Sequence, residues 1–255
     1  MGVTSQIRSS KVPAVTLIFW VIKIAATTLG ETGGDALSMT LNFGYALSTI
    51  IFFGFFLVTA TAQIRARSFH PFLYWAVIVA TTTAGTTMAD FADRSLGVGY
   101  VGGSFILFVL VMLSLAAWWF TEGSVSVNNI TSPRVETFYW VTILFSNTLG
   151  TALGDFLADS GPGYEGGALI FAGALLVVWA VYAFTGVSRT LLFWAAFILT
   201  RPLGATVGDM LTKPQADGGL DLSRISSSAI IAVVIIALII LVPQKAGSHP
   251  GEQPG

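Results

Sequence analysis

The sequence predicts an all-α integral membrane protein, whose eight transmembrane helices form four parallel two-helix repeats in a pseudo-fourfold bundle. Its composition, eight apolar stretches and a fourfold internal repeat support this fold class. Of the 255 residues, 54% are hydrophobic and 10% are charged, and the mean hydropathy is +0.79. Soluble domains carry about 25% charged residues, so too little polar material remains to cover a surface that faces water. We therefore expect residues 1–255 to form a single domain within a lipid bilayer.

The apolar stretches are long enough to cross a membrane as helices. A helix needs about 20 predominantly apolar residues to span the hydrocarbon core. Eight stretches meet this requirement: residues 13–34, 43–62, 71–90, 102–121, 136–157, 167–185, 189–210 and 226–243. Arg8 and Lys11 precede the first stretch, as in a secretory signal. Because this stretch carries the first copy of a repeat that recurs three times, we interpret it as a retained helix.

The repeat consists of a tryptophan, a glycine, a small residue and an aspartate at fixed spacing. The glycine follows the tryptophan by ten residues, the small residue by fourteen and the aspartate by fifteen. The tryptophans are Trp20, Trp75, Trp140 and Trp194, and the aspartates are Asp35, Asp90, Asp155 and Asp209. The glycine and the small residue allow helix backbones to approach closely, so we interpret them as packing residues rather than ligands.

The four copies are expected to form a ring of parallel helices. Each repeat holds two spans, so the chain returns to the same side before the next tryptophan, and all four aspartates reach one face of the membrane. At about 100° per residue, the whole signature occupies less than half of the helix circumference. We assign the repeats to residues 12–62, 70–121, 134–185 and 189–243, with the fourth beside the first. Residues 247–255 are expected to be a disordered tail.

Basic residues are distributed unevenly between the two sets of loops. The chain ends and the loops on their side hold seven: Arg8, Lys11, Arg65, Arg67, Arg134, Arg189 and Lys245. The opposite loops hold Arg94, Lys213 and Arg224. By the positive-inside rule, we expect a multi-pass protein of the cell (inner) membrane with both termini in the cytoplasm.

Several classes of function are disfavoured by composition. The net charge of −1 argues against a nucleic-acid partner. The chain has no cysteine and only two histidines, which argues against disulfides, iron–sulfur clusters, haem and histidine-based zinc sites. We expect no cofactor. No paired nucleophile and base stands out, so we do not expect an enzyme.

The repeat resembles that of a bacterial membrane protein family known as a repeat of unknown function. The resemblance rests on the fourfold tryptophan spacing, on two helices per unit and on the segment from Lys23 to Asp35, KIAATTLGETGGD. It covers residues 12–242 approximately. Family members are described as four tandem repeats, each with two transmembrane stretches and a tryptophan. The resemblance implies a fold and a membrane location, and it leaves the chemistry to be argued from the residues.

Carboxylates near the aspartate end are candidate ligands for a cation. Hard cations such as Mg²⁺, Mn²⁺ or Ca²⁺ take oxygen ligands. Six of these acids occur in three pairs that project from one helix face at spacings of three or four residues, Glu31/Asp35, Asp90/Asp93 and Asp155/Asp159. The candidate metal ligands are Glu31, Asp35, Asp90, Asp93, Asp155, Asp159 and Asp209. The alternative is that they only face water in the mouth of the bundle.

Polar residues deeper in the spans are candidates for a transport path or gate. We assign this role to Lys23, Thr27, Thr28, Asn147 and Arg201. Lys23 could instead extend to the cytoplasmic surface, and Arg201 could serve a purely structural ion pair. Arg201 and Glu31 each lack a partner on their own helix. Because repeat 4 lies beside repeat 1 in a ring, we predict an ion pair between them, with Lys23 below it.

Proline at position 202 removes a backbone donor, and we expect it to open the helix locally.

The leading functional hypothesis is secondary or passive transport of a small cation, in particular a divalent metal ion, through an acidic extracytoplasmic vestibule. The alternative is a non-transporting structural or sensory membrane protein. A homo-oligomer is also compatible with the sequence. Transport requires a polar cavity toward both faces, whereas a scaffold would be sealed by aromatic residues.

Overall fold

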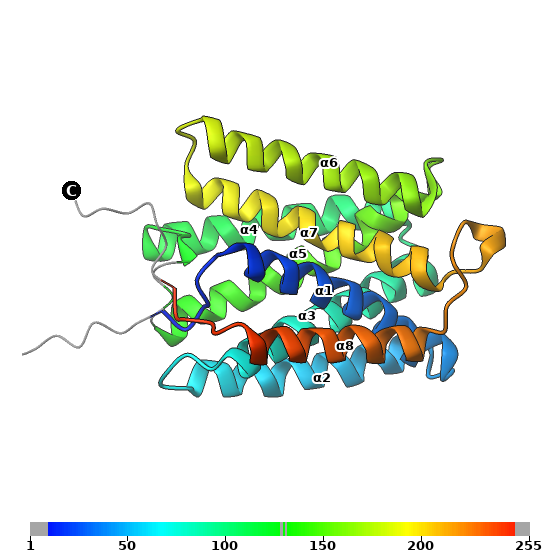
Figure 1. Ribbon diagram of the computed structural model, residues 1–255, viewed down its shortest axis with the longest axis horizontal. Helices are drawn as coiled ribbons and strands as arrows, with labels where there is room; N and C mark the ends of the chain where they lie inside the picture. Colours follow the sequence, from blue (N-terminus) through cyan, green and yellow to red (C-terminus); the bar gives the residue numbers. More distant parts are fainter. Residues whose placement is uncertain (1–9, 128–129, 131, 248–255) are drawn as a thin grey trace, which may run out of the picture.

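The computed structural model describes residues 10–127, 130 and 132–247, and this part of the chain forms a bundle of eight long α-helices. The helices are α1 (Leu17–Asp35), α2 (Gly44–Arg65), α3 (Pro71–Asp90), α4 (Tyr100–Glu122), α5 (Pro133–Asp159), α6 (Gly163–Phe184), α7 (Arg189–Thr212) and α8 (Arg224–Leu241). They lie roughly parallel or antiparallel to one another along the long axis of the molecule (Figure 1). The predicted all-α fold with eight helices is confirmed. The predicted tail, residues 247–255, lies outside the described residues apart from Gly247.

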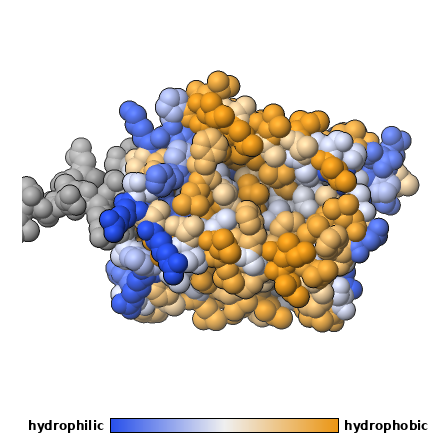
Figure 2. Space-filling view, turned by 90° about the horizontal axis from the view of Figure 1, so that it is seen from below, coloured by the Kyte–Doolittle hydropathy of each residue, from blue (hydrophilic) through white to orange (hydrophobic). Residues whose placement is uncertain are grey.

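Seven helices of the described chain, α2 to α8, are long and apolar enough to cross a membrane. The remaining helix, α1, has a comparable length of 19 residues but carries Lys23, Glu31 and Asp35, all of which are buried. Apolar side chains such as Ile50 and Val58 of α2 and Ile230 and Val233 of α8 are exposed on the outside. Figure 2 shows this apolar belt, with hydrophilic residues gathered at the two ends. The fold is therefore that of an all-α membrane protein.

The odd-numbered helices form an inner ring, and the even-numbered helices cover it. Helix α1 packs against α3, α3 against α5, α5 against α7, and α7 against α1, which closes the ring. Each outer helix packs mainly against the inner helix of the next repeat: α2 on α3, α4 on α5, α6 on α7 and α8 on α1. The predicted fourfold ring of parallel repeats, with repeat 4 beside repeat 1, is confirmed.

Neighbouring inner helices approach closely because the repeat glycine of one helix faces a fixed position of the next helix. This position lies seven residues after the tryptophan of that next helix. A Cβ atom added to Gly30 would collide with Thr82, and one at Gly85 would press on Asn147. The same relation holds for Gly150 with Arg201 and, across the closure, for Gly204 with Thr27. The interpretation of these glycines as packing residues is therefore confirmed.

Helix α7 continues through Pro202 to Thr212, so the predicted opening of the helix at this proline is wrong. The opposing helix explains why the proline is tolerated. Gly150 and Gly154 of α5 have no side chains and lie against Pro202. The proline therefore fits into a small-residue surface while the helix remains continuous.

The two ends of the bundle differ in chemistry. One end, here called the acidic end, holds Asp35, Asp90, Asp155 and Asp209 at or near the ends of the four inner helices. The other, the terminal end, holds both ends of the described chain, where residues 12–14 pair with residues 245–247. Figure 1 shows the described segments before α1 and after α8 at this same end. At the acidic end, α1 is followed by a π-helical turn, Ala36–Thr40, and α3 is followed by another, Phe91–Ser95.

Candidate functional site

An aromatic layer closes the ring toward the terminal end. It consists of the four repeat tryptophans and the aromatic residue before each: Phe19, Trp20, Tyr74, Trp75, Tyr139, Trp140, Phe193 and Trp194. Each tryptophan packs against the preceding repeat's aromatic residue, with centroids 5.5 Å apart for Phe19–Trp75, 5.6 Å for Tyr74–Trp140, 6.2 Å for Tyr139–Trp194 and 5.7 Å for Phe193–Trp20. The hydroxyls of Tyr74 and Tyr139 share a 2.7 Å hydrogen bond. An aromatic residue precedes every repeat tryptophan in the sequence, and this recurrence is the signal that predicts the layer.

Between this layer and the acidic end, Lys23 is fully buried among polar and aromatic groups. Its Nζ donates a 3.4 Å hydrogen bond to Asn147 Oδ1 and lies 4.1 Å from the centroid of the Phe197 ring. Asn147 in turn donates to Thr81 Oγ1 at 2.9 Å. Within the described chain, no carboxylate lies within ion-pair distance of Lys23. The lysine therefore points into the bundle rather than extending to the terminal surface, so the snorkelling alternative is wrong.

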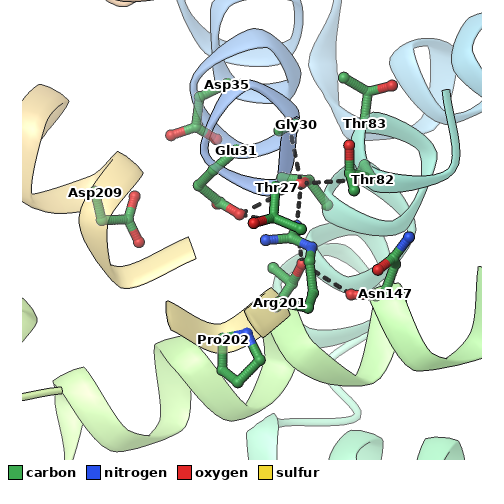
Figure 3. A network of polar contacts seen from close by, with 12 residues as sticks. Thr27, Gly30, Glu31, Asp35, Thr82, Thr83, Asn147, Arg201, Pro202 and Asp209 are labelled. Atoms are coloured by element: carbon green, nitrogen blue, oxygen red, sulfur yellow. Dashed lines mark hydrogen bonds and ion pairs between the residues drawn. The ribbon is translucent and has the colours of Figure 1, made fainter. Parts of the chain in front are cut away.

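One helical turn further toward the acidic end, Arg201 fills the middle of the ring. Its Nη2 lies 3.0 Å from Glu31 Oε2 and donates to Thr86 Oγ1 at 2.6 Å and to Thr151 Oγ1. Glu31, Thr86 and Thr151 each lie eleven residues after their tryptophan, so the guanidinium contacts the same position in three repeats. Figure 3 shows Arg201 and Glu31 pointing toward one another between the inner helices. The predicted Glu31–Arg201 ion pair is confirmed.

At the acidic end, two basic side chains bridge the four repeat aspartates in pairs. Arg94 Nε lies 2.8 Å from Asp90 and its Nη2 3.3 Å from Asp155. Lys213 Nζ lies 2.9 Å from Asp35 Oδ2 and 3.1 Å from Asp209 Oδ1. Both bases occur nineteen residues after a tryptophan, in repeats 2 and 4. Each base thus joins the aspartate of its own repeat to that of the following repeat.

Two of these aspartates, Asp35 and Asp209, form a candidate cation site together with Glu31. We call these three residues the carboxylate triad. One oxygen from each lies within 4.8 Å of the other two, and all three residues are buried. Such oxygens could converge on one hard cation.

Burial alone lowers the pKa of Lys213, but the nearby carboxylates of Asp209 and Asp35 raise it by more. The pKa of Lys213 therefore lies above the ordinary lysine value, and the ammonium remains charged.

The predicted open vestibule is wrong in one respect: the repeat aspartates are buried rather than exposed to water. Their exposed fractions are 1% for Asp35, 3% for Asp90, 5% for Asp155 and 2% for Asp209. Arg94 and Lys213 each lie between two of these carboxylates and help to cover them. The predicted convergence of the acids is correct, but the mouth is closed by ion pairs.

The other predicted residues contribute less to this cluster. Asp93 is partly buried and points toward Gly103 of α4, and Asp159 is exposed. Neither belongs to the carboxylate triad. Thr27 Oγ1 donates to the carbonyl of Thr200 across the ring closure at 3.2 Å. Thr28 donates to Ile24 of its own helix, which indicates a local structural role.

The bundle thus belongs to the class of all-α membrane proteins built from four two-helix repeats around a charged, buried axis. The chain is a member of the family described as Repeat of Unknown Function (DUF347), whose model matches residues 18–69, 73–124, 138–188 and 192–242. These four tandem matches confirm the resemblance noted in the sequence. Neither the curated proteins nor the solved structures include a significant match to this chain.

Proposed function

We propose that this protein is a membrane transport protein that moves a small cation, in particular a divalent metal ion, by secondary or passive transport. The observation that carries the proposal is the carboxylate triad, in which oxygens from Glu31, Asp35 and Asp209 lie within 4.8 Å of one another inside the bundle. Buried carboxylates are costly in a membrane, and they usually belong to an ion path or a partner-binding site. Oxygen ligands at this spacing suit hard divalent cations.

The aromatic layer determines what kind of transport is physically reasonable. Side chains such as Trp75 and Tyr139 are almost fully buried and packed across the ring, so a continuously open channel is disfavoured. A hollow lined by Ala14, Phe19 and Gln244 lies on the terminal side of this layer. A carrier that opens to one side at a time therefore fits the arrangement better than a pore.

The proposed orientation follows from the distribution of basic residues. Arg65, Arg67, Arg134 and Arg189 lie at the terminal end, and all four are exposed or partly exposed. The bases at the acidic end are instead paired with aspartates. We propose the inner membrane as the location, with both termini in the cytoplasm and the acidic end facing outward. Lipid and the cation would be its partners.

A flux assay tests the transport proposal. Purified protein is reconstituted into liposomes that contain a dye whose fluorescence is quenched by Mn²⁺. Mn²⁺ is then added outside. We expect uptake by the natural protein and a reduction of at least about tenfold in Asp35→Asn and Asp209→Asn, the change that about 1.4 kcal/mol of lost binding would give. Asp217→Asn, in an exposed loop, is the matched control and should keep full uptake.

A non-transporting scaffold is the second candidate function, and the aromatic layer favours it. In this case the charges on the axis would only hold the inner helices together. Folded protein that gives no flux of Mn²⁺, Mg²⁺ or Ca²⁺ in either direction would support the scaffold and refute transport.

A further inference from the structure

Lys213 lies where a cation would bind if the carboxylate triad were a metal site. Its Nζ is 2.9 Å from Asp35 Oδ2 and 3.1 Å from Asp209 Oδ1, and both aspartates belong to the triad. The lysine comes from the acidic end of α7, one turn beyond Asp209. The protein thus holds a positive charge of its own between two of the three candidate ligands.

The Lys213 side chain is buried, but the segment that follows it is exposed. Lys213 is the first residue after α7, and Pro214 to Gly218, which follow it, are exposed. Its four-carbon side chain is flexible and ends in a compact charge. Arg224 Nε lies 3.5 Å from Asp35 Oδ2, so Asp35 keeps a basic neighbour when the lysine moves away.

A second feature marks Asp209 as an incomplete ligand for the lysine. Its Oδ1 is buried and makes no hydrogen bond of good geometry within the described chain, although Lys213 Nζ lies 3.1 Å away. The contact is therefore a charge contact without a well-directed hydrogen bond. A divalent cation between Glu31, Asp35 and Asp209 would contact this oxygen without any directional requirement.

We propose that Lys213 is a tethered competitor for the cation, so that the carboxylate triad holds either the Lys213 ammonium or a divalent ion. This inference deepens the proposed function and rests on it for its role in transport. When a cation arrives from the acidic end, the ammonium moves out toward the loop, and the ion takes its place. When the ion leaves, the ammonium returns and restores the closed state. Lys213 is thus a positioning residue that sets affinity and closure, not a ligand.

The experiment compares Mn²⁺ binding to full-length protein in detergent, measured by calorimetry and by thermal stability. If the ammonium occupies the triad nine-tenths of the time or more, its removal in Lys213→Met should tighten Mn²⁺ binding by about tenfold or more. Without metal this variant should melt at a lower temperature, because Asp35 and Asp209 lose the ammonium between them, and Mn²⁺ should restore the loss. Lys213→Arg keeps the charge and should show no gain in affinity. Lys245→Met, an exposed lysine at the terminal end, controls for the loss of one charge.

A measurement on the natural protein keeps the proposal testable if Lys213→Met does not fold. Acetylation of Lys213 by acetic anhydride, read by mass spectrometry and normalised to Lys245, should rise when Mn²⁺ is added, because the ion displaces the ammonium. Unchanged acetylation, or Mn²⁺ affinity in Lys213→Met equal to that of the natural protein, would overturn the inference. Rescue of Lys213→Met by methylammonium but not by Mn²⁺ would also overturn it, since the site would then select amines. Tight Mn²⁺ binding without flux would leave this inference standing and refute transport.

Discussion

Arg201 and Glu31, 170 residues apart in the chain, form a buried ion pair of 3.0 Å that joins the last repeat to the first. The pair closes the inner ring at the level where Thr86 and Thr151 also contact the guanidinium. Its position follows from the repeat. The arginine occupies the place seven after its tryptophan, and its long side chain reaches the level eleven after the tryptophan in the other repeats.

The first prediction concerns the strength of this ion pair. Glu31→Gln or Arg201→Gln alone should destabilise the protein by about 3–5 kcal/mol, because each leaves a buried charge without its partner. The double variant should lose clearly less than the sum, since no charge is stranded. The free energies of unfolding can be measured by SDS titration in detergent micelles. Additive losses would show that the two residues act independently.

The second prediction concerns the close approach of the inner helices. Gly204→Ala should destabilise by about 1–3 kcal/mol, because the new methyl group would overlap Thr27 and force α1 and α7 apart. Gly173→Ala in α6, where no atom lies within 4 Å of the added carbon, is the matched control. It should be neutral or stabilising by about 0.5–1 kcal/mol through helix propensity. Equal effects of the two changes in thermal unfolding would contradict the ring packing described above.

The third prediction concerns the hydrogen bond between Tyr74 and Tyr139 in the aromatic layer. Tyr74→Phe should cost about 1 kcal/mol or more, because the buried hydroxyl of Tyr139 loses its partner. Tyr74→Phe combined with Tyr139→Phe should cost less than twice the single change. Tyr182→Phe, on the exposed surface of α6, should have little effect. The hydrogen bond would be of no energetic consequence if all three variants melted at the natural temperature.

The repeat made the ring predictable, because fixed offsets from the tryptophan encode both depth and helix face. It was enough to predict that Glu31 and Arg201 meet, since both lie inside spans whose depth can be counted. It was not enough to predict the bridges at the acidic end. Lys213 and Arg94 were counted as loop charges, and the direction in which a long side chain bends at a helix end is not encoded in helical periodicity.

The wrong expectations have a common physical origin. The vestibule was expected to be open because the aspartates were considered without their partners, yet Lys213 and Arg94 pair with them and all four aspartates are buried. Helix α7 was expected to open at Pro202 because the proline was considered without α5, whose Gly150 and Gly154 accommodate it. In both cases the outcome depended on a neighbouring repeat, and a single helix considered alone does not contain that information.

The last prediction concerns sidedness, which the absence of cysteine makes simple to test. Single cysteines can be placed at exposed positions of each end: Ser95→Cys and Ala216→Cys at the acidic end, Ser68→Cys and Thr185→Cys at the terminal end. The bases at the acidic end are paired with aspartates, whereas Arg67 and Arg189 remain accessible at the terminal end. Positively charged loops are retained in the cytoplasm, so the terminal end should face inward.

A membrane-impermeant maleimide applied to intact cells should therefore label Ser95→Cys and Ala216→Cys but not the other two variants. After the membrane is permeabilised, all four should react, which controls for the accessibility of each cysteine. The reverse pattern would place the carboxylate triad on the cytoplasmic side, and cation entry from outside would then have to pass the aromatic layer first. Labelling of one position from each end in intact cells would contradict the parallel arrangement of the repeats, because all four acidic helix ends must share one face.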